Sequence, residues 1–178
     1  MVHVSIQHII GTAALLVLVL SLAYAYQVVV TSVQISAIRT QMNQVAEYVA
    51  QSVSDIVSLT EFAYGALSSG TVSKSLKLPA DLSGKPYLVR LESREGGCYV
   101  VVEVSGLSDV YATSPIPLKN ATAAVWIVAD GGFELSDARV KPKPYVYGGN
   151  PKAVVWCEKT WLEGQGYVIL VGLGLRED

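Results

Sequence analysis

Histidines, cysteines and paired carboxylates carry much of protein chemistry, and this chain of 178 residues holds few of them. Its two histidines are His3 and His8, both in an apolar N-terminal stretch. Its acidic residues stand singly between lysines and arginines, as on a solvated surface. The rest of the sequence therefore offers no base for a Ser-His-Asp triad and no histidine for a metal site. We expect no enzyme, no metal and no other cofactor.

Charge is scarce and unevenly placed. The 13 basic and 15 acidic residues give a net charge of -2, which leaves no basic face for nucleic acid. The first charged residue is Arg39, so the first 38 positions are uncharged. The sequence thus has an apolar end and a water-facing end.

The stretch IIGTAALLVLVLSLAYAYQVVV, from Ile9 to Val30, is long enough to cross a hydrocarbon layer of about 30 Å. A cleaved signal peptide fits less well, because MVHVSIQH supplies no basic residue and the helical pattern continues past AYAY. We therefore expect a membrane-compatible helix.

The same helix is predicted to continue far beyond a membrane. No proline precedes Pro79, and Gly11 and Gly65 are the only glycines before Gly70. One helix over about 60 residues would be about 90 Å long. After residue 38 its apolar side chains recur every three or four positions, which predicts one buried face. We divide the chain into the helix, residues 1–66 (apolar part about 4–38, amphipathic part about 39–66), a linker, 67–85, and a head, 86–178.

The apolar segment is longer than a single bilayer needs, since QVVVTSVQISAI continues it without charge. A helix that is apolar on every side is buried on every side. We therefore expect it to occupy first the bilayer and then a bundle of the same segment from many copies. The residues predicted to pack in that bundle are Ile9, Ile10, Gly11, Leu15, Leu16, Leu18, Leu20, Leu22, Val28, Val29, Val30, Ile35 and Ile38.

The head reads as β-structure, because apolar residues there alternate with a period of two. YLVRLES and CYVVVEVS flank a Gly-Gly turn, a strong hairpin signal. AAVWIVAD, AVVWCEKTW and GYVILVGLGL are further strand candidates. Short strands with no helix between them predict an immunoglobulin-like β-sandwich, and the whole chain is then of the α+β class.

Three phrases resemble the type IV pilin-like subunits of archaeal surface filaments, a superfamily that includes archaellins: SIQHIIGTAALLVLVLSLAYAY, MNQVAEYVAQSVSDIVSL and LKLPADLSGKPYLVRLES. The resemblance implies a lollipop, with the helix in a filament core and the β-sandwich outside. It also implies an extracellular homopolymer whose subunits wait in the membrane until a platform protein and an ATPase assemble them. Adhesion or surface attachment is the expected role. The alternative is a single-copy, membrane-anchored accessory protein that binds a surface-layer or archaellum partner.

Two covalent features follow from an extracellular location. Cys98 and Cys157, the only cysteines, both lie on expected strands, and a disulfide between them is favoured over two inert buried thiols. Closing that loop would stabilise the fold by about 4 kcal/mol. Asn120-Ala121-Thr122 is an N-glycosylation sequon in a polar turn.

Overall fold

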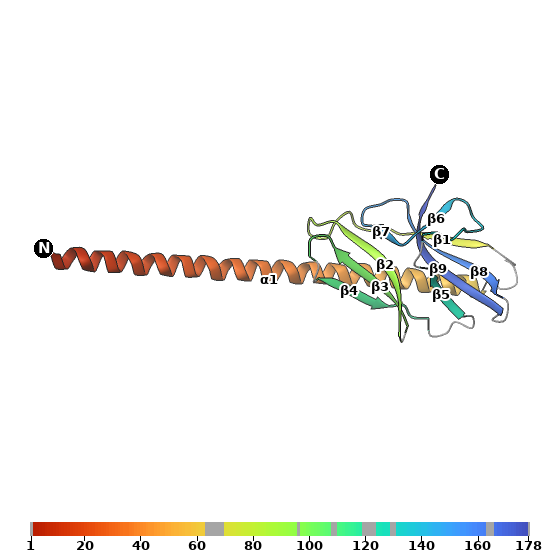
Figure 1. The fold of residues 1–178 in the computed structure, drawn as a ribbon, viewed down its shortest axis with the longest axis horizontal. Coiled ribbons are helices and arrows are strands. Elements are labelled where there is room, and N and C mark those ends of the chain that lie inside the picture. The colour runs from red at the N-terminus through yellow and green to blue at the C-terminus, as the bar shows by residue number, and fades with distance from the viewer. Residues whose placement is uncertain are drawn as a thin grey trace. The chain divides into compact units, whose positions relative to one another are not determined.

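The computed structural model describes residues 2–62, 70–95, 97–107, 110–118, 124–128, 131–162 and 166–177, with side chains from His8 onward apart from that of Leu162. It divides into two compact units, residues 1–38 and 39–178. One helix followed by two β-sheets confirms the expected α+β class with a β-sandwich head (Figure 1).

Helix α1 runs without a break from Val2 to Phe62. Within the second unit its residues 39–62 are amphipathic: Met42, Val49 and Val53 are fully buried, while Asn43, Glu47 and Gln51 are exposed. The spacing of the buried side chains is the helical three-and-four spacing expected from the sequence. This half of α1 therefore supplies one side of the head's hydrophobic core.

The strands form two sheets. Their bounds are β1 Thr71–Ser75, β2 Tyr87–Arg94, β3 Gly97–Val104, β4 Tyr111–Pro115, β5 Ala124–Val128, β6 Val140–Lys143, β7 Tyr145–Tyr147, β8 Ala153–Leu162 and β9 Gly166–Arg176. The five-stranded sheet has the order β1-β8-β9-β5, with β6 also paired to β9. The four-stranded sheet has the order β4-β3-β2-β7. All pairs are antiparallel except β5 with β9.

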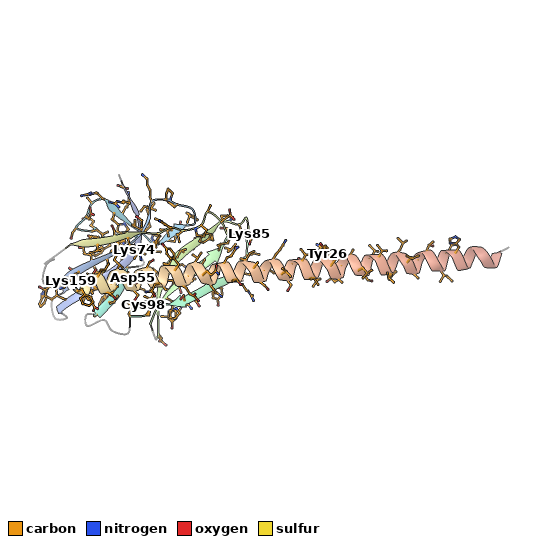
Figure 2. The ribbon with its side chains drawn as sticks, turned by 180° about the vertical axis from the view of Figure 1, so that it is seen from behind. Tyr26, Asp55, Lys74, Lys85, Cys98 and Lys159 are labelled. Carbon is orange, nitrogen blue, oxygen red and sulfur yellow. The ribbon has the colours of Figure 1, made fainter. Side chains whose placement is uncertain are left out.

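The long hairpin of β8 and β9 is the centre of the five-stranded sheet and is buried on both faces. On one face Cys157 lies near Thr60 of α1, and Lys74 of β1 forms an ion pair of 2.9 Å with Asp55 of α1 (Figure 2). On the other face Trp156 stacks on Phe133, with ring centroids 6.0 Å apart. Residues 153–157 of β8 and 168–171 of β9 are therefore continuous apolar runs, as a sheet covered on both faces requires.

The four-stranded sheet instead has one buried and one outward face. Val89, Val100 and Val102 are fully buried, and the register places them on the same face. Tyr99 and Glu103 of β3 lie opposite Glu92 and Leu88 of β2 on the outward side.

The residue that fixes the packing of Trp156 is Gly172, its partner across the β8–β9 pair. A Cβ at Gly172 would lie 2.4 Å from Cζ2 of Trp156. The indole cannot retreat freely, because its Nε1 donates a hydrogen bond of 2.9 Å to the Leu173 carbonyl. Gly172 is therefore required for the close approach of ring and strand.

We predict that Gly172→Ala destabilises the head by about 1–3 kcal/mol, the usual cost of overpacking a core. Thermal unfolding followed by near-ultraviolet circular dichroism should show a melting temperature several degrees lower. Gly132→Ala is the matched control, because no atom lies within 4 Å of a Cβ built there. Equal melting of the two variants would contradict this account of Trp156.

Candidate functional site

The candidate site is the apolar part of α1, which has no cover in the first unit. Of the thirteen residues predicted to pack between copies, Ile38 is buried, Val30 and Ile35 are half-buried, and the other ten are exposed. Leu18 and Leu20, for example, are 57% and 67% exposed. Their packing against other copies stays a prediction, but the single chain leaves them open to it.

Three hydroxyl groups in this segment have partners within the helix. Thr12 donates to the carbonyls of His8 and Ile9 at 3.0 Å, Ser21 donates to Val17 at 2.7 Å, and Thr31 donates to Gln27 at 2.9 Å. A buried hydroxyl without a partner costs free energy. Thr12, Ser21 and Thr31 can therefore enter lipid or a helix bundle without that cost.

The length of the segment exceeds that of a bilayer. At about 1.5 Å per residue, residues 9–30 extend about 33 Å, which is enough to cross the hydrocarbon core. Among the described residues α1 is the one helix long and apolar enough to do so, and this is compatible with membrane insertion. Exposed side chains continue to residue 37 before the first charge at Arg39, so about 10 Å of uncharged helix exceeds the span.

The uncharged segment also contains two exposed tyrosines. Tyr24 and Tyr26 are 72% and 73% exposed, and Figure 2 shows the Tyr26 side chain on the helix surface. Tyrosine prefers the boundary between lipid and water, where its ring is sheltered and its hydroxyl is wet. Tyr26 lies 17 residues after Ile9, or about 26 Å along the axis, close to the thickness of one bilayer core.

Two carboxylates, Asp55 and Glu158, join elements of the second unit. Hydrogen bonds from Lys74 and Gln51 lower the pKa of Asp55, so this residue stays ionised and holds β1 to α1. Buried Glu158 accepts hydrogen bonds from the hydroxyls of Thr71 and Ser136 at 2.6 and 2.8 Å, which fasten residue 136 to the sheet. Among the described residues no three His, Cys, Asp or Glu side chains come together as metal ligands.

The disulfide predicted between Cys98 and Cys157 is absent, and this prediction is wrong: both residues are free thiols. Cys98 lies on β3 of the four-stranded sheet and Cys157 on β8 of the five-stranded sheet. Each thiol has its own polar neighbour, Ser93 for the first and Thr60 for the second. The sequence pattern shows that each cysteine lies on a strand. It does not show that the two strands belong to different sheets, or how far apart the two thiols are.

The sequon residue Asn120 lies outside the described residues. Its glycosylation therefore stays a prediction. The neighbouring described segment, Ile116 to Leu118, is held close to α1 by a hydrogen bond of 3.1 Å from Ser54 to the Pro117 carbonyl.

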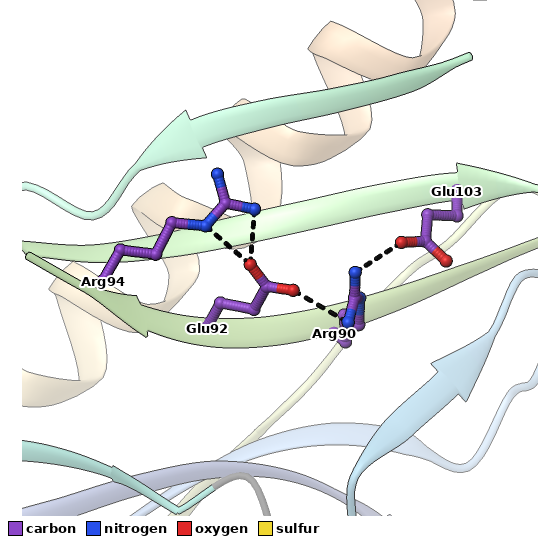
Figure 3. A network of polar contacts seen from close by, with 4 residues as sticks. All are labelled: Arg90, Glu92, Arg94 and Glu103. Atoms are coloured by element: carbon purple, nitrogen blue, oxygen red, sulfur yellow. Dashed lines mark hydrogen bonds and ion pairs between the residues drawn. The ribbon is translucent and has the colours of Figure 1, made fainter. Parts of the chain in front are cut away.

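A charged and aromatic surface that was not expected from the sequence covers the outward face of the four-stranded sheet. Arg94, Glu92, Arg90 and Glu103 follow one another in a row of alternating charge (Figure 3). Arg90 bridges Glu92 and Glu103 at 2.8 and 2.6 Å, and Arg94 bonds the other oxygen of Glu92 at 2.5 Å. The period-two placement of three charges in YLVRLESR was a signal for this row.

Burial gives Cys157 a pH-dependent contribution to stability. It raises the pKa of this thiol from its usual value near 9 to about 11. Between these values the unfolded chain has lost the proton that the folded chain retains, so stability falls as the pH rises from about 9 towards 11.

We predict that Cys157→Ala removes this part of the alkaline loss. One retained proton corresponds to about 1.4 kcal/mol per pH unit, so the wild-type melting temperature should drop more steeply than that of the variant between pH 8 and pH 10. Detergent-solubilised protein followed by circular dichroism provides the measurement. Parallel curves for the two proteins would show that Cys157 does not titrate in this way.

Comparisons with protein-family models, with curated proteins and with solved structures found no match to this chain. Its candidate site is therefore defined by its own geometry. That geometry is an uncharged helix, exposed from residue 8 to residue 37 except at Val30 and Ile35. Its hydroxyls at Thr12, Ser21 and Thr31 are internally bonded.

Proposed function

We propose that this chain is the structural subunit of an extracellular filament of the archaeal type IV pilin-like kind, which polymerises through its N-terminal helix and serves adhesion or surface attachment. The observation that carries the proposal is the exposed, uncharged segment of α1, longer than one bilayer. The proposed role is structural, and the Asp55 and Glu158 carboxylates join elements of the second unit.

The cost of leaving this segment in water makes partners necessary. Burying one large aliphatic side chain is worth about 1.5–3 kcal/mol. Leu15, Leu16, Leu18, Leu20 and Leu22 are each more than half exposed, so these five alone represent on the order of 10 kcal/mol. An environment that covers every side of the helix recovers this energy.

Two environments can do so in turn. A bilayer covers about 20 residues, which suits a subunit stored in the membrane before a platform protein and an ATPase assemble it. A bundle of identical helices can cover the whole segment from residue 8 to residue 37. A Cβ at Gly11 would have no neighbour in the single chain, and because glycine lacks a side chain a neighbouring helix can approach closely there.

The alternative is a single-copy, membrane-anchored protein that binds a surface-layer or archaellum partner. It shares the membrane-spanning helix with the filament subunit. It leaves the surplus of about 10 Å beyond the bilayer, residues 31–37, without cover. That surplus is the specific observation favouring the filament.

We predict that Leu18→Asp abolishes filaments in cells that produce the protein while leaving the head folded. A carboxylate in an apolar bundle costs several kcal/mol, and Leu18 is remote in sequence from the buried face of residues 39–62. Electron microscopy of sheared surface material counts the filaments, and protease resistance of the head reports its folding.

Leu18→Ala is the matched control, because it shortens the same side chain without adding charge and should still allow assembly. Normal filaments from Leu18→Asp would contradict assembly through this helix. Absence of wild-type protein from sheared filaments would instead favour the single-copy alternative.

A further inference from the structure

We propose that the outward face of the four-stranded sheet is a self-association surface, at which two copies of this chain pair about a two-fold axis. The face consists of the side chains that β2, β3, β4 and β7 direct away from the core. Its outward residues are Leu88, Arg90, Glu92 and Arg94 on β2, Tyr99 and Glu103 on β3, Tyr111, Thr113 and Pro115 on β4, and Tyr145 and Tyr147 on β7. Val101 of β3 is on the same side of the sheet but is only 1% exposed, so it lies beneath this surface.

The composition of this face is that of a protein interface. It holds four of the chain's ten tyrosines and two arginines, and none of its outward residues just named is a lysine. Protein interfaces are enriched in tyrosine and arginine and depleted of lysine. Tyr111, Tyr145 and Tyr147 are 60%, 43% and 53% exposed, so their rings are available to a partner.

The aromatic side chains are held in place before any contact forms. The Tyr145 and Tyr147 rings pack edge to face with centroids 5.4 Å apart. The guanidinium carbon of Arg94 lies 5.9 Å from the centre of the Tyr99 ring. Ordered aromatic groups lose little conformational entropy on binding.

The charges specify the partner. Along the row from Arg94 through Glu92 and Arg90 to Glu103 the signs are plus, minus, plus, minus (Figure 3). Alternate residues of a strand are about 7 Å apart, so the row is about 20 Å long. An even, alternating row turned end for end presents minus, plus, minus, plus.

Two copies related by a two-fold axis between Arg90 and Glu92 therefore bring opposite charges together at every position. Arg94 of one copy faces Glu103 of the other, and Arg90 faces Glu92. This is the self-complementarity that an isologous contact requires. A second copy of the chain is thus the occupant that the charge pattern fits.

The contact is small. Four strands about 4.8 Å apart and a row about 20 Å long offer less than the 800 Å² per partner of a standard interface. Single heads should therefore pair with micromolar affinity. In filaments of the kind proposed above, many such faces would act together and join neighbouring fibres. The pairing of single copies does not depend on filament formation.

The test is sedimentation equilibrium of the full-length protein in density-matched detergent from micromolar to submillimolar concentration. Arg94→Glu should weaken dimerisation at least tenfold, since it places like charges opposite each other at both ends of the row. Arg139→Glu is the control, an exposed arginine outside this face.

The decisive variant combines Arg94→Glu with Glu103→Arg. It breaks the ion pairs with Glu92 and Arg90 inside each copy, yet it restores opposite charges between copies. The dimer constant should return to within about threefold of the wild-type value. This recovery cannot come from repair of the single chain.

Three results would overturn the proposal: a wild-type protein that shows no pairing sensitive to Arg94→Glu, a double variant that stays as weak as the single one, or an equal effect of Arg139→Glu. If Arg94→Glu lowers the melting temperature, Tyr147→Ala replaces it, and an unchanged dimer constant for that variant counts equally against the proposal. Failure here leaves the filament proposal standing, because the latter is tested by Leu18→Asp.

Discussion

A helix that is apolar on every side must be surrounded on every side, and this requirement governs both what the chain can be and how it is built. The two parts of helix α1 meet this requirement in different ways. Between residues 39 and 62 only one face is apolar, and it is buried within the second unit. Between residues 8 and 37 no element of the same unit covers the helix, so the cover has to come from lipid or from other chains.

The helix is also a component of the head's core. Met42, Val49 and Val53 are as completely buried as Val89 and Val102 of the four-stranded sheet. Polar contacts add to this packing, for Lys74 and Asp55 join β1 to the helix and Ser83 donates to Gln41 at 3.1 Å. Because the same covalent helix continues upstream, a bundle formed by the apolar segment brings a folded head with every copy.

Much of this fold was predictable because its signals are local. A helix free of proline, an apolar spacing of three and four, and strands β2, β3, β5, β8 and β9 all follow from short windows of sequence. The structure adds β1, β4, β6 and β7, which the sequence analysis did not identify. VKPK has a proline and two lysines, YVY is three residues long, and TVSKS and YATSP are short and polar. Strands of this kind form where a neighbour supplies the pairing, as β9 does for β6 and β2 for β7.

The two proposed contact surfaces, the apolar segment and the outward face of the four-stranded sheet, also differ in how far the sequence predicts them. The apolar segment could be recognised from composition alone, since every residue up to Ile38 lacks charge. The complete row of alternating charges could not be recognised in this way. Glu103 joins Arg94, Glu92 and Arg90 only because the strand register pairs it with Leu88. The prediction of the disulfide was wrong for a related reason. The sequence pattern places Cys98 and Cys157 on strands but does not show that these strands belong to different sheets.

The two proposed surfaces also differ in what symmetry allows them to do. A contact between unlike patches repeats from copy to copy and can build a fibre of any length, whereas a contact of one patch with itself closes after two copies. The apolar helix has no charge to fix a single partner orientation, so it suits the repeating contact. The alternating row on β2 and β3 fixes both orientation and register through its charges. A subunit that has one surface of each kind can lengthen a filament through its helix and link filaments through its head without the two contacts competing.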